Sequence, residues 1–170
     1  VRKLIHLFSL SIPVIYYFIP TSTSITILLY FTIFALIVDG GRFIFKSFAK
    51  IFYKLFGFLL RKHELDNKKK NLTGATYVLL SALICALIFP KIIFVTAFTI
   101  LIISDSTAAL IGRKFGKRKF LRKSLAGTLS FFISASIVIL ITPKVGNFPL
   151  EYLIGFVAAF VGAIVENVSY

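Results

Sequence analysis

Three of the six acidic residues have the side-chain type and the spacing to bind a divalent cation together. Asp39, Asp105 and Glu166 each come 15 to 18 residues after the start of an apolar segment. On helices with a rise of about 1.5 Å per residue, they lie roughly 22 to 27 Å into a hydrocarbon core about 30 Å thick. Oxygen ligands from separate helices suit Mg²⁺, so the sequence predicts a shared magnesium site. The alternative is helix-end ion pairing of these acids with Arg42, Arg113 or Lys123.

A dense group of small, glycine and basic residues begins at Asp105. It contains Gly112-Arg113-Lys114-Phe115-Gly116-Lys117 and continues to Lys123-Ser124-Leu125-Ala126-Gly127. A glycine-containing basic loop at a helix end can hold polyphosphate through amide N–H groups and cationic side chains. The group matches neither a Walker A motif nor a Rossmann fingerprint. It therefore predicts a phosphate-binding loop, with a basic turn between two membrane spans as the alternative.

Thr73 and Gly74 repeat this theme at the start of another apolar stretch, directly after the lysines of residues 68–70. By contrast, His6, His63 and Cys85 are poor metal ligands, because none has a second His or Cys nearby. We expect Cys85 to be a small packed hydrophobe.

The composition decides the class of protein that must position these residues. Hydrophobic residues make up 58% and charged residues 15% of the 170, which argues against a disordered chain and a water-soluble globule. A net charge of +14 is compatible with nucleic-acid binding, but the apolar runs are too long for that function. We expect one integral-membrane domain over residues 1–170.

The apolar runs predict an all-α, polytopic helix bundle of about six transmembrane helices. They cover residues 4–19, 25–38, 72–89, 92–103, 125–141 and 152–165, and the weakly polar flank 104–111 lengthens the fourth. Within residues 42–60, Arg42, Lys46, Lys50 and Lys54 recur every fourth residue among many phenylalanines. That pattern indicates an amphipathic interfacial helix, either separate from or continuous with the second span.

The basic residues predict which ends of the spans face the cytoplasm. If the N-terminus is cytoplasmic, 18 of the 20 Lys and Arg residues fall on that side, and only Lys91 and Lys144 fall on the other. This bias predicts a multi-pass protein with both termini and the candidate site at the cytoplasmic face. The basic face would adhere to anionic headgroups, at about 1 kcal/mol per Lys or Arg.

The block from Asp105 to Thr128 resembles the CTP-dependent lipid kinases, which include dolichol kinase, phytol kinase and the CTP-using diacylglycerol kinase. Weaker likeness is found in residues 2–6, 61–64, 72–77 and 162–166, so the resemblance covers most of the chain. The family is distantly similar to phosphatidate cytidylyltransferases, which share the Lys-Ser/Thr-x-x-Gly feature found here at Lys123. Many members have Glu where this chain has Ala126. The family commonly continues past the final Glu into an Asp-Asp-Asn segment, so the resemblance implies that the chain is either truncated at Tyr170 or has an incomplete site.

The resemblance implies transfer of the γ-phosphoryl group of CTP to the hydroxyl of a membrane lipid alcohol, namely a polyprenol or dolichol, phytol or diacylglycerol, with Mg²⁺ as cofactor. Asp105 and Lys123 are the expected catalytic residues, and Asp105, Glu166 and Asp39 the metal ligands. Asp105 could instead accept the hydroxyl proton. The expected nucleotide-binding residues are Gly112, Arg113, Gly116, Lys117, Lys123, Ser124, Gly127, Thr73 and Gly74.

Two other functions compete with a lipid kinase. Cytidylyl transfer from CTP to phosphatidate would use similar residues but release pyrophosphate. A small ion channel or transporter would use the buried acids as an ion path, but the acids gather at one face of the membrane instead of crossing it. The membrane would be the cell membrane of a bacterium or archaeon, or the endoplasmic reticulum of a eukaryote.

Overall fold

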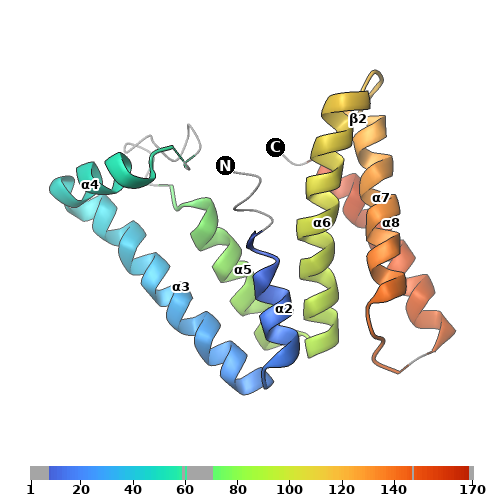
Figure 1. Ribbon diagram of the computed structural model, residues 1–170, viewed down its shortest axis with the longest axis horizontal. Helices are drawn as coiled ribbons and strands as arrows, with labels where there is room; N and C mark the ends of the chain where they lie inside the picture. The colour runs from blue at the N-terminus through green and yellow to red at the C-terminus, as the bar shows by residue number, and fades with distance from the viewer. Residues whose placement is uncertain (1–7, 59, 61–70, 147, 169–170) are drawn as a thin grey trace. The chain divides into compact units, whose positions relative to one another are not determined.

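The computed structural model describes residues 8–58, 60, 71–146 and 148–168 and contains seven helices and one small hairpin in this part of the chain (Figure 1). The residues at 2–6 and 61–64 that contribute to the family resemblance lie outside the described residues, as do His6, His63 and the lysines at 68–70. The chain divides into two compact units, and each is described by itself.

Unit 1 consists of α3 (Thr21–Ile44), α4 (Lys46–Phe56) and α5 (Gly74–Ile88). The long helix α3 packs against α5, and the hydroxyl of Thr32 on α3 donates to the carbonyl oxygen of Leu79 on α5 at 3.4 Å. At Phe45 the backbone is extended, with φ −105° and ψ 108°, so α3 ends and α4 starts as a separate helix. The predicted interfacial helix is thus not continuous with the second span.

Unit 2 consists of α2 (Ser11–Phe18), α6 (Lys91–Phe115), strands β1 (Lys119–Phe120) and β2 (Lys123–Ser124), α7 (Leu125–Ile141) and α8 (Pro149–Val168). Helix α7 packs against both α6 and α8. Small residues in the buried core let these helices approach closely, as is usual in membranes. The core residues are Ala108, Phe131, Ala135, Ile139, Ala159 and Ala163.

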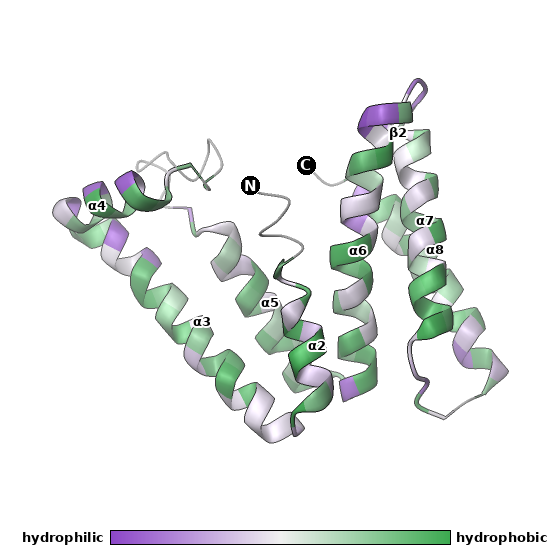
Figure 2. Cartoon of the chain, viewed as in Figure 1, coloured by the Kyte–Doolittle hydropathy of each residue, from purple (hydrophilic) through white to green (hydrophobic). Residues whose placement is uncertain are grey.

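Three of the helices, α3, α6 and α8, are long and apolar enough to cross a membrane, whereas α5 and α7 are shorter apolar helices. Only 11% to 28% of the residues in the most apolar part of each long helix are buried. Their remaining surface is rich in Phe, Ile, Leu and Val, which water would not tolerate over such an area (Figure 2). The protein is therefore a helical membrane protein, while the count of six spans and the side of the termini stay predictions.

The predicted apolar stretches correspond to helices, with differences at their ends. The stretch 125–141 coincides with α7, but the stretch 92–103 is only part of α6, which continues through residues 104–111 to Phe115. The first half of the predicted basic loop is consequently the last turn of α6. The remainder forms the hairpin β1–β2, the one departure from an all-helical fold in the described chain, with Lys119 opposite Ser124.

Candidate functional site

Lys123 lies where the hairpin of unit 2 joins helix α7 (Figure 1). The next residue, Ser124, is the N-cap of α7, and its hydroxyl accepts a hydrogen bond from the amide of Gly127 at 3.1 Å. Serine is a preferred N-cap because its side chain satisfies one of the amides that the first turn leaves unpaired. The Lys-Ser-x-x-Gly pattern therefore places a cationic side chain beside a helix N-terminus, where the helix dipole also favours anions.

The side chain of Lys123 forms an ion pair with Glu166 near the end of α8. The distance from Nζ to Oε1 is 2.5 Å, and the two side chains are 36% and 13% exposed. This is one of the helix-end pairings that the sequence left open as the alternative to a metal site. The lysine is still accessible from solvent, so it can meet a soluble anion.

Asn167, directly after Glu166, fixes the backbone of this lysine. Its side-chain oxygen accepts hydrogen bonds from the amides of Arg122 and Lys123 at 3.0 and 3.2 Å, and its nitrogen donates to the Thr128 hydroxyl at 2.5 Å. Asn167 is fully buried. Asn167 is not among the site residues predicted from the sequence. A polar amide beside a carboxylate at the end of an otherwise apolar helix is the signal that could have identified it.

The three glycines of the block hold α6 close to the start of α7. A Cβ atom at Gly112 would lie 2.9 Å from the Ser124 hydroxyl oxygen, and one at Gly127 would lie 3.2 Å from the carbonyl oxygen of Ala108. A Cβ at Gly116 would lie 2.6 Å from the Ser124 Cβ. The observed function of these glycines is close helix packing, and contact between their backbone and a nucleotide stays a prediction.

Arg113 and Lys117 contribute exposed positive charge at the same end of α6. Arg113 and Lys114 lie in the last turn of the helix, and Lys117 follows the C-cap residue Gly116. Polar residues are concentrated here and in the hairpin, whereas most of α6 is apolar (Figure 2). With Lys123 they form a basic end of unit 2 that can attract a polyphosphate.

Asp105 lies on α6 two turns before Gly112, about 10 Å further along the helix axis. It is half-buried, and the neighbouring Ser104 is fully buried. Two residues later, the hydroxyl of Thr107 is hydrogen-bonded to the hydroxyl of Ser134 on α7 at 2.9 Å. Asp105 therefore lies on a stretch of α6 that contains several polar residues, about two turns from the basic end.

Asp39, in unit 1, has buried partners of its own. One of its oxygens is 3.2 Å from Nη2 of Arg42, and the other accepts hydrogen bonds from the Thr73 amide at 2.7 Å and the Thr76 hydroxyl at 2.8 Å. Thr73 is the N-cap of α5, whose first residue is Gly74. These contacts join α3 to the start of α5, and a nucleotide-binding function of Thr73 and Gly74 stays a prediction.

These contacts bear on whether the acids fit a magnesium ion. Asp39 and Glu166 each have a cationic partner, and no group of three or more His, Cys, Asp or Glu side chains with metal-binding geometry occurs among residues 8–58, 60, 71–146 and 148–168. Asp39 belongs to unit 1, whereas Asp105 and Glu166 belong to unit 2, so a site shared by all three acids stays a prediction. Binding of Mg²⁺ by Asp105, Glu166 and Asp39 stays a prediction.

Comparison with known proteins reveals two relatives. The chain is 30% identical over 163 residues to the uncharacterized protein RP860 of Rickettsia prowazekii (strain Madrid E), a match that covers 96% of this chain and 78% of the relative. It is also 32% identical over 98 residues to the CTP-dependent diacylglycerol kinase 1 of Schizosaccharomyces pombe, covering 56% of this chain and 43% of the kinase. No family model matches the chain, and no solved structure does.

Proposed function

The chain belongs to the same family as the uncharacterized protein RP860 of Rickettsia prowazekii, and from this premise we propose that it is a CTP-dependent lipid kinase. It would transfer the γ-phosphoryl group of CTP to the hydroxyl of a membrane lipid alcohol. The observation that carries the proposal is the partial similarity to a kinase named for its use of CTP and diacylglycerol. Dolichol, another polyprenol, phytol and diacylglycerol are the candidate acceptors.

The geometry of unit 2 supports this reaction. Phosphoryl transfer depends chiefly on positioning and on stabilising the charge of the transferred group. The Lys123 ammonium, the N-terminus of α7 and the exposed Arg113 and Lys117 are suited to hold a triphosphate. An apolar helix surface beside this basic end would let the lipid alcohol approach from the membrane.

The proposed step forms one bond and breaks one bond. The lipid hydroxyl oxygen attacks the γ-phosphorus, the bond from that phosphorus to the oxygen bridging to the β-phosphate breaks, and CDP leaves. The hydroxyl proton passes to a base, for which Asp105 is a candidate. Asp105 is equally a candidate ligand for Mg²⁺, which when bound neutralises phosphate charge. We propose that the reaction takes place at the cytoplasmic face.

The experiment that tests the proposal uses purified protein in lipid nanodiscs and CTP labelled either at the α- or at the γ-phosphate. Diacylglycerol, polyprenols, phytol and phosphatidate are supplied in parallel. A kinase transfers only the γ label and releases CDP. Transfer of the α label to phosphatidate with release of pyrophosphate would instead establish cytidylyl transfer, and transfer of neither label would overturn both enzyme assignments.

Lys123→Ala tests the phosphate-binding assignment in the same assay. We expect weaker CTP binding with an unchanged melting temperature, because the side chain is partly exposed and its ion pair adds little stability. Lys91→Ala is the matched control, since Lys91 lies at the other end of α6. Equal CTP affinities for the two variants, measured at the same salt concentration, would reject the function of Lys123 in phosphate binding.

A further inference from the structure

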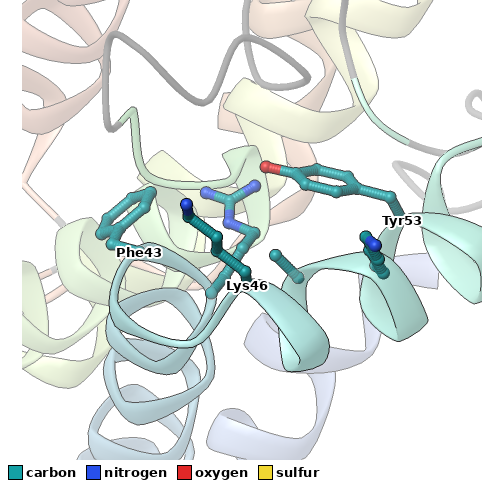
Figure 3. A pocket seen from close by; sticks show the side chains of 6 residues that line it. Phe43, Lys46 and Tyr53 are labelled. Atoms are coloured by element: carbon teal, nitrogen blue, oxygen red, sulfur yellow. The ribbon is translucent and has the colours of Figure 1, made fainter.

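A basic pocket of about 390 Å³ lies in unit 1, at the junction between α3 and α4 (Figure 3). This volume is within the roughly 300–1,000 Å³ typical of small-molecule sites. Lys46, Lys50 and Tyr53 contribute from one face of α4, at the spacing that puts side chains on the same side of a helix. The lining residues are Arg42, Phe43, Lys46, Ala49, Lys50 and Tyr53.

The charges around the pocket favour an anion with two negative charges. None of the six lining residues is acidic, and three of them are cationic. Asp39 pairs with Arg42 and compensates one of these charges, so Lys46 and Lys50 supply two that Asp39 does not offset. Lys46 is also the first residue of α4, where the positive end of the helix dipole adds to the attraction.

The buried Arg42 side chain forms part of the pocket wall and is held in place by several contacts. The Arg42 side chain is fully buried, and its Nη2 donates to the carbonyl oxygen of Asn71 at 2.6 Å. Its guanidinium lies 4.9 Å from the ring centre of Phe43 and 5.7 Å from that of Tyr53. Figure 3 shows the Lys46 side chain directed toward the space between the labelled rings of Phe43 and Tyr53. Because the Nη2 atom of Arg42 is bound by Asp39 and Asn71, the exposed donors that the pocket offers to a phosphate are those of Lys46 and Lys50.

We propose that this pocket binds a phosphate monoester, the dianionic group found at the head of a singly phosphorylated lipid and, in its free form, in inorganic phosphate. A phosphodiester headgroup has one negative charge and would leave a positive charge uncompensated. Recognition here does not depend on the proposed kinase reaction, which we place in unit 2.

The surface of α4 makes a lipid headgroup the favoured source of the phosphate. Ile51, Leu55 and Phe56 are 46% to 59% exposed on a helix that also presents Lys46, Lys50 and Lys54. A helix with exposed apolar and basic faces lies in the membrane interface, at the level of the headgroups. A phosphate attached to a lipid would therefore be at the depth of the pocket.

The test compares three single variants that each remove one positive charge from α4. Lys46→Gln and Lys50→Gln alter the pocket, whereas Lys54→Gln is the matched control because Lys54 does not line it. Arg42 is left intact, since its removal would strand the buried Asp39. The full chain is placed in nanodiscs of phosphatidylcholine containing either phosphatidate or phosphatidylserine, and retained lipid is counted by native mass spectrometry.

We expect the unaltered protein to retain phosphatidate over phosphatidylserine, and Lys46→Gln and Lys50→Gln each to reduce this retention about fivefold. Lys54→Gln should retain as much as the unaltered protein. In a second arm, inorganic phosphate is titrated into the detergent-solubilised variants. If only inorganic phosphate binds, with the same dependence on Lys46 and Lys50, the free ion is the source. Equal effects of all three variants, or no phosphate binding in either arm, would overturn the proposal.

Discussion

At the scale of single residues, two acids of this chain have cationic partners that compensate their charge. Asp39 has Arg42, an amide and a hydroxyl around it in a buried site, and Glu166 has Lys123. A buried ion pair contributes little net stability as a pair, but losing one partner is costly because it leaves an uncompensated charge. The same Asp→Asn change should thus have different effects at different positions.

Asp105→Asn should lower Mg²⁺-dependent CTP turnover per folded molecule by about 100-fold or more. The substitution keeps the size of the side chain and removes the charge that a metal ion or a proton needs.

Asp39→Asn is the matched comparison for this experiment. It should lower the melting temperature markedly, because removing the partner of the buried Arg42 costs roughly 3–5 kcal/mol. Turnover and thermal unfolding are measured on the same preparations. A destabilised Asp105→Asn protein with normal turnover per folded molecule would contradict the proposed function of Asp105.

Glu166→Gln distinguishes pairing with Lys123 from metal binding, because loss of the ion pair changes KM for CTP, whereas loss of a metal ligand changes the Mg²⁺ requirement. If Glu166 only neutralises Lys123, its amide variant frees the lysine for phosphate, and KM for CTP should fall about two- to fivefold with an unchanged Mg²⁺ requirement. This is the result that we expect from titrations of CTP and Mg²⁺. A tenfold higher Mg²⁺ requirement would assign Glu166 to the metal.

At the scale of the elements, the contact between α6 and the start of α7 depends on the absence of side chains. Gly112→Ala would put a Cβ 2.9 Å from the Ser124 hydroxyl oxygen and 3.4 Å from the Gly127 Cα. The N-cap of α7 must shift to accept it, so we expect a loss of about 1–3 kcal/mol in the free energy of unfolding and weaker CTP binding.

Gly40→Ala is the matched control for this substitution. Gly40 lies inside α3, and a Cβ there would meet no atom within 4 Å. Alanine should therefore stabilise this helix by up to about 1 kcal/mol. Both proteins are unfolded thermally in the same detergent. Similar effects of the two substitutions would show that the packing of α6 on α7 is not limited by Gly112.

At the scale of the whole molecule, the two basic residues predicted to lie outside the cytoplasm are at helix ends. Lys91 is the first residue of α6. The ammonium of Lys144 donates to the carbonyl oxygens of Ile139 and Thr142 at the end of α7 and lies 4.5 Å from the ring centre of Tyr152. A lysine that binds the final carbonyls of a helix is favoured by the helix dipole. This capping contact by itself accounts for the position of Lys144 at the end of α7.

The topology is tested by single cysteines introduced into a Cys85→Ala background. In intact cells, a membrane-impermeant maleimide should label Lys91→Cys and Val145→Cys, and it should label Arg118→Cys only after permeabilisation. Val145 replaces Lys144 as the labelling position because it is exposed and its side chain makes no cap. Labelling of Arg118→Cys from outside would place the basic end of unit 2 on the wrong side for cytoplasmic CTP.

The sequence by itself determined approximately where most of the helices lie. Hydropathy and helix-breaking residues are local properties of the chain, so the stretch 125–141 could be predicted as α7 without knowledge of its neighbours. The amphipathic character of α4 was also predicted, but the sequence left open whether this helix is separate from α3, because Phe45 has no special preference for an extended backbone.

Only the tertiary structure decided which groups meet. Lys123 and Glu166 are 43 residues apart, and Asp39 and Thr73 are 34 apart. Such pairs form when packed helices bring their ends together, and the sequence allowed several partners for each acid. The packing also gave the glycines their function, because close contact between α6 and α7 is a property of two helices and not of either alone.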